Sequence, residues 1–190
     1  MQASANRETS AGASPEVVRA AFGELHGTRL HGYALLVTLG DRAQAARLTA
    51  EALAAGTARA PELRHPERGA AWLRRRVLEA AGHTGGANRR RSAEESRMAL
   101  EGLGVGEAAF AGLSALTTRE RAALVADSVE RLDRGDVGTV VGINGSRLDM
   151  LIRKVRARYA AAVAGALEDE VAGNGPTAAR IRAVAAQALK

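Results

Sequence analysis

Residues 133–159, DRGDVGTVVGINGSRLDMLIRKVRARY, carry the pattern that decides the fold. The valines before Gly142 and the aliphatic residues after Asn144 recur every three to four positions, which predicts two helices. Asp133 and Asn144 are expected to cap these helices, and Gly142 can adopt the left-handed conformation that a tight turn requires. A short helix, a tight turn and a longer helix together form a helix-turn-helix arrangement.

The outer face of the second helix is polar and basic, because such residues fall outside its apolar stripe. A helix of this kind fits the major groove of DNA, where its first residues reach base edges and later basic residues meet phosphates. Asp149 is an acidic residue on this otherwise polar and basic face. Its carboxylate would repel phosphate but could accept a hydrogen bond from cytosine. A helical hairpin with a merely solvated outer face is the alternative. The candidate DNA-binding residues are Asn144, Ser146, Arg147, Asp149, Met150, Arg153, Lys154 and Arg156.

The positive charge of the chain is concentrated in two places. The net charge is +6 overall, with +5 over residues 57–100, −2 over 101–135 and +3 over 136–160. Two basic segments around an acidic middle indicate a polyanion contacted at two places, although an arginine-rich composition on solvated faces is a plainer explanation. The candidate DNA-binding residues of the first basic segment are Arg74, Arg75, Arg76, Arg89, Arg90 and Arg91.

The rest of the sequence shows only helical periodicity, so we predict an all-α fold of two small helical domains joined by a linker. Helix starts are indicated by Asp41 after Gly40 and by the capping-box pair Thr117 and Glu120. Four glycines in the middle of the chain indicate the linker. The predicted parts are a disordered N-terminus (1–14), a first domain (15–100), the linker (101–112), the helix-turn-helix domain (113–160) and an extension (161–190) that is either disordered or ends in an amphipathic helix over 177–189.

Several classes of protein are not expected from the composition. The chain has no cysteine, and its four histidines are far apart, so we expect no metal site and no cofactor. No apolar run approaches the roughly 20 residues that span a bilayer, and the first residues lack the apolar core of a secretory signal. No nucleophile or phosphate-loop pattern is present. We therefore expect a cytoplasmic protein that has no membrane partner and is not an enzyme.

Residues 113–159, which begin LSALTTRERAALVADSVERL, resemble the fourth conserved region of bacterial sigma factors of the extracytoplasmic-function type. In that family a leucine pair, an Arg-Glu-Arg-like helix start and an L-G-I-S turn precede a basic recognition helix. Here Leu113 and Leu116, Arg119–Arg121 and Val141–Asn144 occupy those places.

The N-terminal half resembles the second conserved region of the same family. Residues 31–56, HGYALLVTLGDRAQAARLTAEALAAG, are similar to a helix ending in L-T-G-D that is followed by A-E-D-L-V-Q-E. His65–Glu67 and Ala71–Leu73 resemble the D-P-E and A-W-L motifs, and Arg89–Arg91 fall at the basic cluster that ends this region. The resemblance spans about residues 15–160, in order and with similar spacing.

The resemblance implies a non-enzymatic subunit that directs core RNA polymerase to promoter DNA. The first domain would bind core polymerase and the proximal promoter element, and the second domain would bind the distal element through its recognition helix. The linker would run through the polymerase, and an anti-sigma factor is a further implied partner. The residues at the implied core-polymerase site are Arg47, Leu48 and Glu51.

The sequence also departs from the family pattern. Arg47 and Ala50 stand where the family has an acid and a glutamine, and a reversed charge weakens a matched interface or changes its partner. A sigma-like DNA-binding regulator that has lost or altered core-polymerase binding is therefore the alternative function. A third class is a module that sequesters another protein, whose activity would not need Arg153, Lys154 or Arg156.

Overall fold

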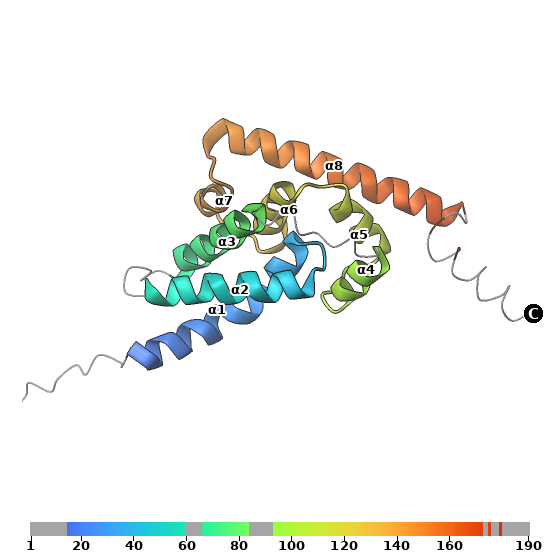
Figure 1. Ribbon diagram of the computed structural model, residues 1–190. Helices are drawn as coiled ribbons and strands as arrows, with labels where there is room; N and C mark the ends of the chain where they lie inside the picture. Colours follow the sequence, from blue (N-terminus) through green and yellow to red (C-terminus); the bar gives the residue numbers. More distant parts are fainter. Residues whose placement is uncertain (1–14, 60–65, 84–92, 173–174, 176–178, 180–190) are drawn as a thin grey trace, which may run out of the picture.

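The computed structural model describes residues 15–59, 66–83, 93–172, 175 and 179, which form helices and the turns between them, with no strand (Figure 1). The all-α prediction is confirmed. Residues 1–14, Arg89–Arg91 and almost all of the predicted final helix 177–189 lie outside the described residues. The elements are α1 (Pro15–Val37), α2 (Arg42–Ala58), α3 (Pro66–His83), α4 (Ala93–Glu101), α5 (Glu107–Ser114), α6 (Thr118–Leu124), the π-helical turn η1 (Val125–Val129), α7 (Arg134–Val141) and α8 (Gly145–Val171).

Local side-chain hydrogen bonds begin the helices where the sequence indicates. The carboxylates of Asp41 and Asp133 each accept a hydrogen bond from the backbone N–H three residues later. Thr117 Oγ1 accepts a hydrogen bond from the N–H of Glu120 at 3.3 Å, and the Glu120 carboxylate accepts one from the N–H of Thr117 at 2.9 Å. The predicted caps at these three helix starts are confirmed.

The two predicted halves of the chain share one apolar core. Buried side chains of the first half, such as Leu48 and Leu73, belong to the same cluster as Val125, Val137 and Leu148 of the second half. Helix α7 packs against α3, and α6 packs against α1 (Figure 1). The predicted halves are therefore in direct contact rather than held apart.

The predicted linker over residues 101–112 is wrong for most of its length. Only residues 102–106 form a turn, because α5 begins at Glu107 and packs along α8. Gly112, one of the four glycines that indicate the linker, lies within α5, where a Cβ atom would lie 2.5 Å from the Tyr159 ring. The glycine thus permits α5 to approach α8 closely. Helix α8 also continues past the predicted boundary at residue 160 and ends at Val171.

A buried arginine of α6 joins the C-terminal end of α1 to the end of α5 and the turn after it. Arg121 Nε donates a hydrogen bond to the Val37 carbonyl oxygen at 2.9 Å. Its Nη1 donates to the carbonyl oxygens of Leu116 at 2.6 Å and Leu113 at 3.3 Å. Burial lowers the pKa of Arg121 to about 10, so the side chain remains a cation at neutral pH. The Arg-Glu-Arg motif thus supplies a structural tie between the two halves.

Gly40→Ala is expected to lower the free energy of unfolding by about 2–4 kcal/mol, because an L side chain is strained at its φ of 80° and would collide with a neighbouring backbone. The colliding group is the carbonyl of Ser96 in α4, which cannot rotate away as a side chain can. Urea unfolding followed by circular dichroism measures the change. Gly23→Ala in α1 is the control, because nothing lies within 4 Å of its added Cβ, and it should stabilise the protein by about 0.5–1 kcal/mol. Equal effects of the two substitutions would contradict the close approach of α4.

Candidate nucleic-acid interface

Helices α7 and α8 are joined by the predicted tight turn. Gly142 has a φ of 70°, and its N–H donates to the carbonyl oxygen of Gly138 at 2.8 Å. The N–H of Ile143 donates to the same oxygen at 3.2 Å. Asn144 occupies the N-cap position of α8, but its side chain makes no cap hydrogen bond, so the prediction that it caps the helix is wrong in that respect.

One face of α8 is anchored and the opposite face is exposed. Leu148, Ile152 and Val155 are almost fully buried, which fixes the rotation of the helix about its axis. The predicted DNA-binding residues of this segment are all exposed, and they lie on α8 or at its N-cap. They are Asn144, Ser146, Arg147, Asp149, Met150, Arg153, Lys154 and Arg156.

The cations on this face differ in how far they are already paired. Within the described part of the chain, Arg147, Arg153 and Lys154 have no ion-pair partner. Arg156, in contrast, lies 2.7 Å from a carboxylate oxygen of Asp127. The three unpaired cations offer positive charge to an anion, whereas the charge of Arg156 is partly neutralised.

Asp127 and Arg134 belong to the face, although the sequence analysis did not select them. Arg134 forms an ion pair with Asp149 and a second one with Asp127 at 3.3 Å. These residues line a surface hollow of about 580 Å³ together with Arg153. The negative charge of Asp149 is therefore compensated by Arg134. The position of Arg134 just after the Asp133 cap was a visible signal, but nothing local in the sequence connects Asp127 with α8.

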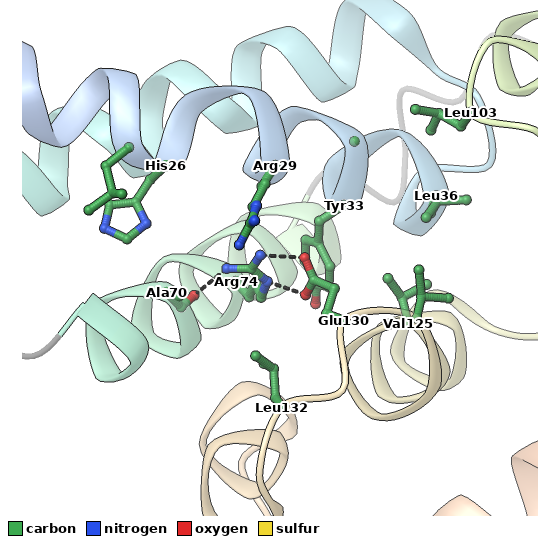
Figure 2. A pocket seen from close by; sticks show the side chains of 13 residues that line it. His26, Arg29, Tyr33, Leu36, Ala70, Arg74, Leu103, Val125, Glu130 and Leu132 are labelled. Atoms are coloured by element: carbon green, nitrogen blue, oxygen red, sulfur yellow. Dashed lines mark hydrogen bonds and ion pairs between the residues drawn. The ribbon is translucent and has the colours of Figure 1, made fainter.

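The arginine run on α3 divides between the core and the surface. Arg74 is 4% exposed and forms a two-pronged ion pair with Glu130, while its Nη1 donates to the Ala70 carbonyl oxygen at 2.9 Å (Figure 2). The prediction that Arg74 contacts DNA is wrong in this structure, because its guanidinium is buried and its donors are used.

The other two arginines of the run remain on the surface. Arg75 and Arg76 are exposed, and both form ion pairs with Glu79, at 2.8 Å and 3.3 Å. The hydrogen bond from Arg75 lowers the pKa of the Glu79 carboxyl, which stays ionised. Arg75 lines a groove that also includes Gly142, so the fold brings part of the first basic segment beside the α7–α8 turn.

The implied core-polymerase residues lie on α2. Leu48 is fully buried in the core, so the prediction that it binds a partner is wrong in this structure. Arg47 and Glu51 are both about half exposed and form an ion pair of 2.7 Å with each other. The exposed carboxylate at this site therefore already has a cation beside it.

Comparisons of the chain with protein-family models, with curated proteins and with solved structures find no match. Within the described ranges, no three histidine, aspartate or glutamate side chains lie where they could hold a metal ion together. No helix in those ranges is both long enough and apolar enough to cross a bilayer. The inference of function therefore rests on the geometry of α7 and α8.

Proposed function

We propose that this chain is a DNA-binding transcription factor that reads duplex DNA with the exposed face of α8. The observation that carries this proposal is the set of three unpaired cations, Arg147, Arg153 and Lys154, on a helix whose other face is locked into the core. A fixed helix with exposed basic residues after a tight turn matches what major-groove binding requires. Phosphate contacts by such cations supply affinity, and the side chains near the start of the helix supply base recognition.

More specifically, we propose a sigma factor that directs core RNA polymerase to particular promoters. The order and spacing of the motifs over residues 15–160 support this function, as does the exposure of the predicted recognition face. Arg75, which lines the same groove as Gly142 and is paired with Glu79, would be a second point of contact with the promoter. A sigma factor needs no catalytic group of its own, because the polymerase performs the chemistry.

The test is initiation in vitro by core RNA polymerase supplied with the full chain. Sequencing the 5′ ends of transcripts made from fragmented genomic DNA should show start sites that core polymerase alone does not use. The variant Arg153→Ala/Lys154→Ala, with two of the three unpaired cations removed, should lose these start sites while still binding core polymerase. Failure of the unaltered chain to bind core polymerase in a pull-down would exclude the sigma function.

A regulator that retains DNA binding without core-polymerase binding is the second candidate. The Arg47–Glu51 ion pair favours it, because Arg47 neutralises the exposed carboxylate at the implied polymerase site. Arg47→Glu should then raise core-polymerase affinity by about tenfold, as expected for a charge restored at an electrostatically matched interface. Arg42→Glu on the same helix is the matched control, since it changes the net charge equally at another exposed position. Equal affinities of the two variants would count against this explanation.

A further inference from the structure

A cavity of about 590 Å³ lies between α1, α3 and the chain that connects η1 to α7 (Figure 2). This volume falls in the range of about 300–1,000 Å³ that is usual for sites that bind small organic molecules. Most of the side chains that line the cavity are apolar, as is also usual for such sites. The larger aliphatic ones are Leu25, Leu36, Leu103, Val125, Val129 and Leu132.

Three of these aliphatic side chains form an exposed rim. Leu25 is 58% exposed, Leu103 is 45% exposed and Val129 is 64% exposed. They come from α1, from the turn after α4 and from η1, so that three separate segments of the chain meet at this rim. Exposed apolar side chains that gather at one place mark a binding site, whereas scattered ones do not. A ligand with an apolar body would remove the rim from water.

The charges of the lining do not cancel. Arg74 and Glu130 offset each other in their ion pair. Arg29 also lines the cavity, is exposed, and has no ion-pair partner within the part of the chain that the structure describes. Figure 2 shows its side chain pointing from α1 into the cavity. The lining therefore carries one uncompensated positive charge.

The other polar groups of the lining do not compensate that charge. Among the described residues that line the cavity, Glu130 supplies the single carboxylate, and both of its oxygen atoms accept hydrogen bonds from Arg74. Burial and the positive charge of Arg74 lower the pKa of His26, so that imidazole is neutral at pH 7. The cation of Arg29 is thus left for an anion from solution.

An apolar rim and a single unpaired cation together favour an amphipathic anion. An uncharged apolar ligand would take water away from the Arg29 guanidinium without replacing it, which costs free energy. One acidic group on the ligand would replace that water by a charge-assisted hydrogen bond. A ligand with several charges would find no second unpaired cation among the described lining residues and would place charge against the apolar rim.

We propose that this cavity binds a small molecule with an apolar body and a single acidic group, such as a medium-chain fatty acid. The acidic group pairs with the Arg29 guanidinium, and the apolar body covers Leu25, Leu103 and Val129. The site does not include the exposed face of α8, so the proposal is independent of DNA binding.

The test compares two fluorescent probes that share one ring system. The probe 1-anilinonaphthalene-8-sulfonate carries one negative charge, and N-phenyl-1-naphthylamine is the same molecule without its sulfonate. Each is titrated with the full chain, without DNA or polymerase. We expect saturable 1:1 binding of the sulfonate, and decanoate should displace it at lower concentration than 1-decanol does. Absence of saturable sulfonate binding, or equal displacement by decanoate and 1-decanol, would overturn the proposal.

The substitution Arg29→Gln tests the role of the cation. It should weaken binding of the sulfonate by about tenfold and leave binding of the uncharged amine unchanged, because only the sulfonate pairs with the guanidinium. The unfolding free energy should not change, since Arg29 is exposed and has no ion-pair partner in the described chain. Arg42→Gln is the control, because Arg42 is an exposed arginine of α2 outside the cavity lining. Arg29→Gln without effect on sulfonate binding, or with no more effect than Arg42→Gln, would reject the anion site.

A second variant tests whether the apolar body of the probe lies at the rim. Val129→Asp places a charge among the exposed aliphatic side chains and should weaken binding of both probes by at least about tenfold. Val17→Asp is the matched control, because Val17 is a valine of similar exposure, 58%, outside the cavity lining. Probe binding that is unchanged by Val129→Asp would place the probes elsewhere on the protein and would reject this cavity.

Discussion

Glu130→Leu is expected to lower the free energy of unfolding by about 3–5 kcal/mol, because it leaves the cation of Arg74 buried without its carboxylate. The Arg74 side chain is 5% exposed and that of Glu130 is 16% exposed. The pair connects α3 to the segment before α7, two parts of the chain that are 56 residues apart. Urea unfolding monitored by circular dichroism provides the measurement, with the midpoint and the slope fitted separately.

The double variant Arg74→Met/Glu130→Leu separates the loss of the ion pair from the loss of packing. Replacing both charges by apolar side chains removes the uncompensated cation, so most of the lost stability should return. Arg47→Ala is the control for an exposed ion pair and should change the unfolding free energy by less than about 0.5 kcal/mol. A double variant as unstable as Glu130→Leu alone would contradict the argument from buried charge.

The triple variant Arg147→Ala/Arg153→Ala/Lys154→Ala is expected to weaken binding to duplex DNA by on the order of 10²-fold at 0.1 M salt. Each lost phosphate contact also reduces the slope of log K against log salt by about 0.9, so the slope should become shallower by nearly 3 units. Fluorescence anisotropy with a labelled duplex over a series of salt concentrations measures both quantities.

Two companion variants show whether the effect belongs to this face. Arg42→Ala/Arg47→Ala/Arg59→Ala removes the same charge from α2 and its C-terminal end and should leave the salt slope nearly unchanged. Asp127→Asn removes the carboxylate that pairs with Arg134 and Arg156, so it should raise the affinity and steepen the slope. Equal losses in the two triple variants would mean that total charge, rather than the exposed face of α8, determines DNA binding.

The arginine run on α3 shows how far sequence reasoning reached and why it failed in part. Three adjacent arginines look equivalent in a charge count, but successive helical residues point in different directions. Position 74 lies four residues after Ala70 and three before Val77, which places it on the inward side of the helix. That spacing was a usable signal for burial. The partner, Glu130, was not predictable because no local pattern connects it to α3.

In the second half, the apolar spacing of the sequence is informative about α8, whereas its glycines are misleading about α5. The stripe of Leu148, Ile152 and Val155 correctly predicts the buried face of α8. The glycines of residues 101–112 predict a linker, although Gly112 lies within α5 and permits its contact with α8. A glycine has the same appearance in a sequence whether it allows chain flexibility or close packing. Only the position of the neighbouring helix shows whether a glycine allows flexibility or close packing.

Local sequence patterns predict the all-helical class, the caps at Asp41, Thr117 and Asp133, and the turn at Gly142, because the interactions behind them join residues at most five positions apart. Packing between distant segments sets which charges remain available to a partner. Arg74 and Arg156 find their carboxylates 56 and 29 residues away, and such distant pairs form only when helices pack.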